Sequence, residues 1–119
     1  MKIFVALAIF EACPRAFLDD VDAVRDALKN AVIAGRFTLL DLVARPFSPQ
    51  GVTACAVVGE SHIALHTWPE EGRLFADIAS CSSPESVRRA LDAIAASVHP
   101  GRLALCQERT LDPDRRSEP

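Results

Sequence analysis

The residues that could carry chemistry gather in one segment, residues 59–81, which reads GESHIALHTWPEEGRLFADIASC. It holds two of the three histidines, the only tryptophan and the triplet Glu60-Ser61-His62. A serine beside a histidine suggests nucleophilic catalysis. However, the residues around Ser61 do not form the G-x-S-x-G turn that exposes the serine of many hydrolases. We therefore do not expect a serine hydrolase.

Metal binding and plain structural roles are the other interpretations of these residue types. His62 and His66 are four residues apart, a spacing that on a helix would place both on one face as metal ligands. The apolar residues between them instead predict a strand, and no third ligand is evident, so no metal is expected. Taken alone, Trp68 would indicate a structural turn before proline, and Cys81 would be a small buried hydrophobe.

Taken together, these residues resemble the small prokaryotic class of the S-adenosylmethionine decarboxylase proenzyme family, which matures into pyruvoyl enzymes. The matching motifs are Glu-Ser-His, then His-Thr-Trp-Pro-Glu, then Ala-Asp-Ile leading to Cys81. The spacings from Ser61 to His66 and to Cys81 also agree with that family. The resemblance covers nearly the whole chain, and residues 47–81 carry it specifically.

The resemblance implies that the chain cuts its own backbone between Glu60 and Ser61. Residues 1–60 would become the β chain and residues 61–119 the α chain of a single decarboxylase domain. The Ser61 hydroxyl would attack the preceding carbonyl, and elimination from the resulting ester would leave a covalent pyruvoyl group derived from Ser61. The chain would thus be a zymogen that makes its own cofactor.

Three further residues support this chemistry by the same resemblance. His66 matches the family's base for the serine α-proton, a task that suits a neutral imidazole. Thr53 stands where a serine usually holds the intermediate, and its added methyl group predicts slower processing. A pyruvoyl carbonyl forms a Schiff base with a substrate amine and accepts electrons as carbon dioxide leaves. Cys81 matches the residue that then returns a proton.

The resemblance also assigns substrate contacts. Phe47 matches a loop phenylalanine that reaches across the dimer to the partner's site, and Trp68 is a second platform for adenine or the sulfonium cation. Glu70 matches the acid that binds the ribose hydroxyls. The family's tyrosine after Pro-Glu is Glu71 here, and its glycine after the cysteine is Ser82. The family's Gly-x-His stretch before the first strand is also missing, and these departures leave the processing residues untouched.

The substrate implied is S-adenosylmethionine, decarboxylated to the aminopropyl donor for spermidine and polyamine synthesis. Homologous pyruvoyl enzymes decarboxylate arginine or ornithine, and Glu71 would add an acid for the distal cation of such a substrate. Phe47 and Glu70 favour the nucleoside. A third alternative is an unprocessed regulatory paralogue, which would remain one chain where an enzyme becomes two.

The elements that must position these residues follow from apolar periodicity. An amphipathic helix is predicted over 17–34, and a second opens at the serine-proline pair of 82–85. Strands are predicted at 2–9, 37–45, 52–58, 62–66, 74–79 and 102–106. This order predicts a two-layer α+β sandwich, an antiparallel sheet with both helices on one face. The other face is too apolar for water, which predicts a homodimer through the sheets or their edges.

Composition narrows the class further. The 119 residues, 50% hydrophobic and 24% charged, suit one globular domain. A net charge of −3 with only two lysines disfavours nucleic acid, and the longest apolar run, residues 3–10, is too short to cross a membrane. Four cysteines without a C-x-x-C pair, and Glu11 where a signal peptide would need a small residue, predict the cytoplasm. The tail from Glu108 is predicted to be frayed.

Overall fold

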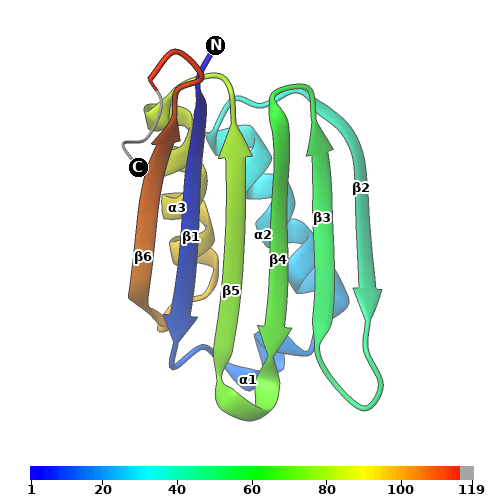
Figure 1. The fold of residues 1–119 in the computed structure, drawn as a ribbon. Coiled ribbons are helices and arrows are strands. Elements are labelled where there is room, and N and C mark those ends of the chain that lie inside the picture. Colours follow the sequence, from blue (N-terminus) through cyan, green and yellow to red (C-terminus); the bar gives the residue numbers. More distant parts are fainter. Residues whose placement is uncertain (116–119) are drawn as a thin grey trace.

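The computed structural model describes residues 1–115 as one antiparallel sheet with two long helices on one face (Figure 1). The six strands lie in the order β2-β3-β4-β5-β1-β6. They are β1 Ile3–Glu11, β2 Leu39–Pro46, β3 Val52–Val58, β4 Ser61–Trp68, β5 Arg73–Ser80 and β6 Arg102–Leu111. The helices are α1 Arg15–Leu18, α2 Val21–Ala34 and α3 Pro84–Ser97, with the short 3-10 helix η1 Pro69–Glu71 between β4 and β5. The predicted two-layer α+β sandwich is confirmed.

The core lies between the sheet and helices α2 and α3. Ile63 and Leu65 of β4 are fully buried, as are Leu28 of α2 and Ile94 of α3. Each side chain of this kind contributes roughly 1.5–3 kcal/mol when it leaves water. Because side chains alternate along a strand, burying Ile63 and Leu65 turns their neighbour His66 to the opposite face. The core thus sets which residues of β4 lie on the uncovered side.

The predicted helix over 17–34 is in fact two helices. The Asp20 carboxylate accepts hydrogen bonds from the backbone N–H groups of Asp22 at 3.0 Å and Ala23 at 3.2 Å. A carboxylate in this position satisfies N–H groups that have no partner within the helix, so α2 begins after Asp20 and the preceding turn, α1, stands apart.

The prediction of a frayed tail is wrong for residues 108–111. They belong to β6, which pairs with β1 as far as Leu111 opposite Ile3. The main-chain hydrogen bonds of an edge strand order this polar segment although its side chains are exposed. Residues 116–119 of the predicted tail lie outside the described residues.

Within the described residues no helix covers the second face of the sheet, called here the open face (Figure 1). Apolar side chains are exposed along several strands, with exposed fractions of 38% for Leu7, 44% for Val43, 46% for Val57 and 66% for Leu105. Apolar side chains spread over a sheet in this way are typical of surfaces that contact another molecule. No helix in residues 1–115 is long and apolar enough to cross a membrane.

Candidate active site

The predicted cleavage site lies at one end of the sheet, in the loop that joins β3 to β4 (Figure 1). Ser61 begins β4 and pairs with Ser80, the last residue of β5. The main-chain carbonyl oxygen of Glu60 accepts a hydrogen bond from the backbone N–H of Cys81 at 3.0 Å. The structure therefore brings the predicted scissile carbonyl next to the predicted proton donor.

Ser61 has an unusual backbone conformation. Its φ is 152°, a value that residues with a side chain rarely adopt. A two-residue hairpin loop usually carries its positive φ within the loop. Here neither loop residue, Gly59 nor Glu60, has a positive φ. The irregular backbone instead falls on the residue after the predicted cut, as strained residues often do at functional sites.

The side chain of Glu60 is anchored to the segment before β2. Its carboxylate accepts hydrogen bonds from the backbone N–H of Thr38 at 2.9 Å and from the Thr38 hydroxyl at 3.1 Å. The N–H bond is the main reason that the pKa of Glu60 is lowered from its ordinary value, and it outweighs the opposing effect of burial. Glu60 is therefore negatively charged at neutral pH.

A second group of predicted residues lies at the opposite end of β4. Thr53 of β3 pairs with His66, and the Thr53 hydroxyl oxygen lies 3.2 Å from His66 Nδ1. The His66 ring stacks on Phe75, with ring centroids 5.9 Å apart, and its centroid lies 6.4 Å from that of Trp68. Sequence reasoning missed Phe75. Only the register of β4 against β5, which pairs it with His66, could have found it.

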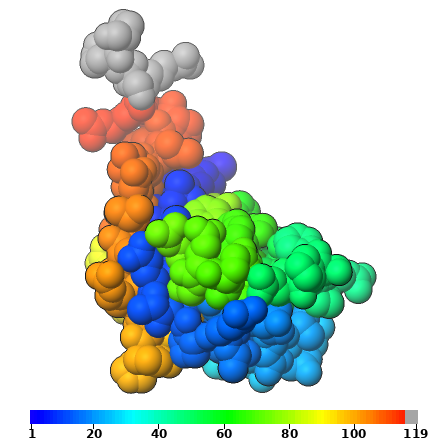
Figure 2. All heavy atoms as spheres, turned by 90° about the horizontal axis from the view of Figure 1, so that it is seen from below, coloured from blue at the N-terminus to red at the C-terminus, as the bar shows by residue number. Residues whose placement is uncertain are grey.

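A pocket of about 230 Å³ opens at this second end. The loop that carries Phe47 is closed by a hydrogen bond from the Phe47 N–H to the Gly51 carbonyl at 2.8 Å. Figure 2 views this end and shows the loop beside the η1 turn. The pocket is lined by Phe47, Ser48, Gln50, Thr53, His66, Thr67, Trp68 and Glu70. It therefore brings together the three predicted substrate contacts and the predicted base.

The two groups do not meet within one chain. Ser61 and His66 are five residues apart on one continuous strand, which at about 3.3 Å per residue separates them by roughly 17 Å. Hydrogen bonding and proton transfer need atoms about 3 Å apart. One end of the sheet holds Glu60, Ser61 and Cys81, and the other holds Phe47, Thr53, His66, Trp68 and Glu70.

The remaining histidine of the segment, His62, lies at the cleavage end beside Ser61. His62 Nε2 is 3.3 Å from the Asp77 carboxylate, and His62 Nδ1 is 3.4 Å from the Ser61 hydroxyl. His62 and His66 lie roughly 13 Å apart along β4, too far to share one metal ion. Within residues 1–115 no three His, Cys, Asp or Glu side chains are arranged to hold a metal ion.

A model of the protein family described as S-adenosylmethionine decarboxylase matches residues 6–109, a range that includes every residue of both groups. The chain therefore belongs to the S-adenosylmethionine decarboxylase family, as the sequence motifs predicted. A crystal structure of the adenosylmethionine decarboxylase from Aquifex aeolicus has the same fold. Its TM-score is 0.81 over 98% of this chain and 97% of that one, at 24% sequence identity.

Curated relatives carry the name S-adenosylmethionine decarboxylase proenzyme. The one from Methanococcus vannielii is 48% identical over 69 residues, 58% of this chain and 57% of the relative. The one from Aquifex aeolicus is 35% identical over 86 residues, 72% of this chain and 64% of the relative. In both, the match spans less than two thirds of the relative's length. The one from Thermomicrobium roseum is 34% identical over 91 residues, 76% of this chain and 78% of the relative.

Proposed function

We propose that this chain is a pyruvoyl-dependent decarboxylase that cleaves itself between Glu60 and Ser61 and then acts on S-adenosylmethionine. One observation carries the proposal. The Glu60 carbonyl is held by the Cys81 N–H directly beside the irregular backbone of Ser61. Membership of the family and the name proenzyme among its relatives add support.

The residues at the cleavage end suit an acyl shift followed by elimination. The Ser61 oxygen attacks the Glu60 carbonyl carbon, an ester C–O bond forms, the C–N bond between the residues breaks, and the hydroxyl proton passes to nitrogen. The Cys81 N–H, 3.0 Å from the carbonyl oxygen, stabilises the negative charge that develops there. Loss of the Ser61 α-proton then breaks the ester C–O bond and expels the main-chain carboxylate of Glu60, which becomes the new C terminus of residues 1–60. Addition of water and release of ammonia leave the pyruvoyl group.

The surroundings of Ser61 fit the group that this reaction would produce. Once formed, a pyruvoyl group accepts electrons as carbon dioxide leaves the substrate. Cys81 lies next to position 61 and is exposed, so its thiol can reach a bound substrate and return a proton to the α-carbon. All four cysteines are free thiols, which agrees with the reducing cytoplasm that we expect.

We propose that the base for the Ser61 α-proton is His66, the residue that the family resemblance assigns to this step, and that it comes from a second copy of the chain. His66 lies roughly 17 Å from Ser61 along β4 and on the open face, and Ser61 lies at the exposed start of the same strand. In the homodimer that we propose, the open faces of two copies pack against each other, and a two-fold axis lies between the two sheets, perpendicular to the strands. It would lay β4 antiparallel over β4 of the partner, so that each Ser61 would meet the other copy's His66. We therefore propose a homodimer with two sites, each built from both copies, which would also cover the apolar side chains of the open face.

The pocket at the second end favours a nucleoside substrate. Phe47 and Trp68 offer exposed aromatic rings, 58% and 41% exposed, for adenine and the sulfonium cation. Glu70 lines the same pocket and offers a carboxylate to ribose hydroxyls. In the proposed dimer this pocket would face the partner's Ser61 and Cys81, so that substrate binding and reaction would share one site.

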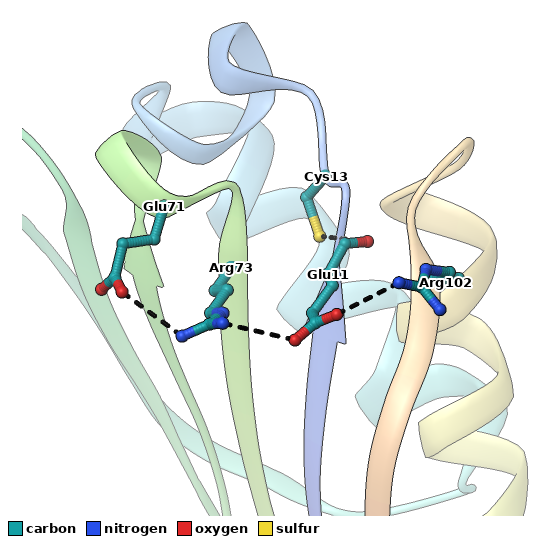
Figure 3. Close-up of polar contacts among 5 residues, drawn as sticks. All are labelled: Glu11, Cys13, Glu71, Arg73 and Arg102. Atoms are coloured by element: carbon teal, nitrogen blue, oxygen red, sulfur yellow. Dashed lines mark hydrogen bonds and ion pairs between the residues drawn. The ribbon is translucent and has the colours of Figure 1, made fainter.

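A basic amino acid substrate would need a free carboxylate for its distal cation, and Glu71 is not free. Its carboxylate pairs with Arg73 at 3.3 Å, and Arg73 also pairs with Glu11 at 3.5 Å (Figure 3). Glu11 pairs in turn with Arg102 at 3.3 Å. This row of alternating charges crosses β5, β1 and β6, and it supports S-adenosylmethionine over arginine or ornithine.

The test is the release of labelled carbon dioxide from carboxyl-labelled S-adenosylmethionine, arginine and ornithine by the purified protein. We expect release from S-adenosylmethionine alone, and none from the Ser61→Ala variant. Preference for arginine or ornithine would contradict the substrate. A chain that stays uncut and inactive would contradict the enzyme and favour a regulatory paralogue.

A further inference from the structure

We propose that Thr38 is a positioning residue for self-cleavage, because it anchors Glu60 in the geometry that places the irregular backbone on Ser61. The inference rests on the proposed function, since it concerns the maturation reaction of the same site. Thr38 lies in the segment between α2 and β2, and none of the motifs discussed above includes it.

Three hydrogen bonds join Thr38 to the two-residue loop. The Thr38 N–H and hydroxyl donate to the two carboxylate oxygens of Glu60, at 2.9 and 3.1 Å. The Thr38 carbonyl accepts from the Gly59 N–H at 2.8 Å. One residue thus holds the side chain of one loop position and the main chain of the other, and hydrogen bonds to a charged carboxylate are stronger than those between neutral groups.

This anchor accounts for the position of the irregular backbone. A free two-residue hairpin loop relaxes by taking positive φ at its own residues. With Glu60 and Gly59 both tied to Thr38, the loop keeps ordinary φ values and the value of 152° falls on Ser61. Releasing the Glu60 side chain would let the loop turn. The Glu60 carbonyl would then lose its hydrogen bond from the Cys81 N–H, the group that stabilises negative charge on the carbonyl oxygen during the acyl shift.

The experiment follows cleavage of the full-length chain made by cell-free translation, on denaturing gels over time. Thr38→Val keeps the side-chain shape and the backbone N–H but removes the hydroxyl, whereas Thr38→Ser keeps the hydroxyl. Glu60→Gln removes the charge. Thr110→Val, on the edge strand β6, is the matched control for loss of a threonine hydroxyl elsewhere. Thermal unfolding midpoints show that each variant folds.

We expect Thr38→Val to cleave about tenfold more slowly, which corresponds to about 1.4 kcal/mol in the barrier. Glu60→Gln should also be slow, while Thr38→Ser and Thr110→Val should cleave at the wild-type rate. Hydroxylamine cuts esters, so it should not speed cleavage of Thr38→Val if the block precedes the ester.

Wild-type cleavage by Thr38→Val would overturn the inference. So would equal slowing in Thr38→Ser, or full rescue of Thr38→Val by hydroxylamine, which would place the defect after the acyl shift. In all three cases the proposed function stands, because the wild-type chain cleaves. A wild-type chain that never cleaves would instead refute the proposed function and this inference with it.

Discussion

Two uncleavable variants, Ser61→Ala and His66→Ala, are expected to restore cleavage when they are produced together in one cell. Ser61→Ala lacks the hydroxyl that attacks, and His66→Ala lacks the base. Because these residues lie roughly 17 Å apart along β4, each site should take its serine from one copy and its histidine from the other. A mixed dimer then has one site with both substitutions and one site with neither.

The size of the effect follows from this geometry. If two equally abundant variants pair at random, about half of all dimers are mixed, so about half of the His66→Ala chains sit opposite an intact His66. These chains keep their own Ser61 and should be cut. The Ser61→Ala chains should all stay whole. About a quarter of all chains should therefore be cleaved, and about a quarter of the wild-type decarboxylase activity should return.

Intact-mass spectrometry detects the cleaved chains. A 61–119 fragment from the His66→Ala chain is identified by its mass, because it carries alanine in place of histidine. The control pairs His66→Ala with a chain that carries both substitutions, and there no fragment should form. Restored cleavage only in the first pair supports the shared site. If His66→Ala stays uncut beside Ser61→Ala in dimers of proven mixed composition, the two-copy site is wrong.

Three other predictions test separate parts of the structure. Cys81→Ser keeps the backbone N–H, so cleavage should proceed. Labelled carbon dioxide release per cleaved chain should fall about 100-fold or more, because the thiol that donates the proton is lost. Unchanged turnover would show that Cys81 is not the proton donor. Ile63→Ala should lower the free energy of unfolding by about 2–5 kcal/mol, whereas Ile33→Ala, on the exposed side of α2, should change it little; equal effects would contradict the assigned core. Folding lowers the pKa of Glu60, so the ionised carboxylate stabilises the folded chain. This contribution to the free energy of unfolding is complete above the ordinary pKa of 4.5 and is lost as the pH falls through the lower pKa of the folded state. Glu60→Gln in a Ser61→Ala chain should flatten this acid dependence of the thermal midpoint, and an unchanged pH profile would argue against the Thr38 anchor.

Much of the fold could be predicted, because alternating burial leaves a clear period in the sequence. Strand β4 is an example, with Ile63 and Leu65 apolar on the core side and His62 and His66 on the open face. The break between α1 and α2 was harder, since apolar residues continue across it and only the Asp20 side chain decides where the second helix begins. The strand at residues 108–111 left no pattern, because main-chain pairing with β1 orders it.

The site was predicted as a set of residues but not as an arrangement. The motifs that contain Ser61, His66 and Cys81 identify the chemistry, yet their spacing does not say that Cys81 meets Glu60 while His66 lies at the far end of the strand. That separation depends on which strands pair and in what register. Contacts between distant segments, such as the one from Thr38 to Glu60, also leave no local signal.

The measurement that tests self-cleavage most directly is denaturing intact-mass spectrometry of the purified chain. We expect two fragments that divide between Glu60 and Ser61, with the 61–119 fragment blocked at its N terminus by a pyruvoyl group. A single unmodified chain of 12.9 kDa that persists after long incubation would contradict the proposed enzyme.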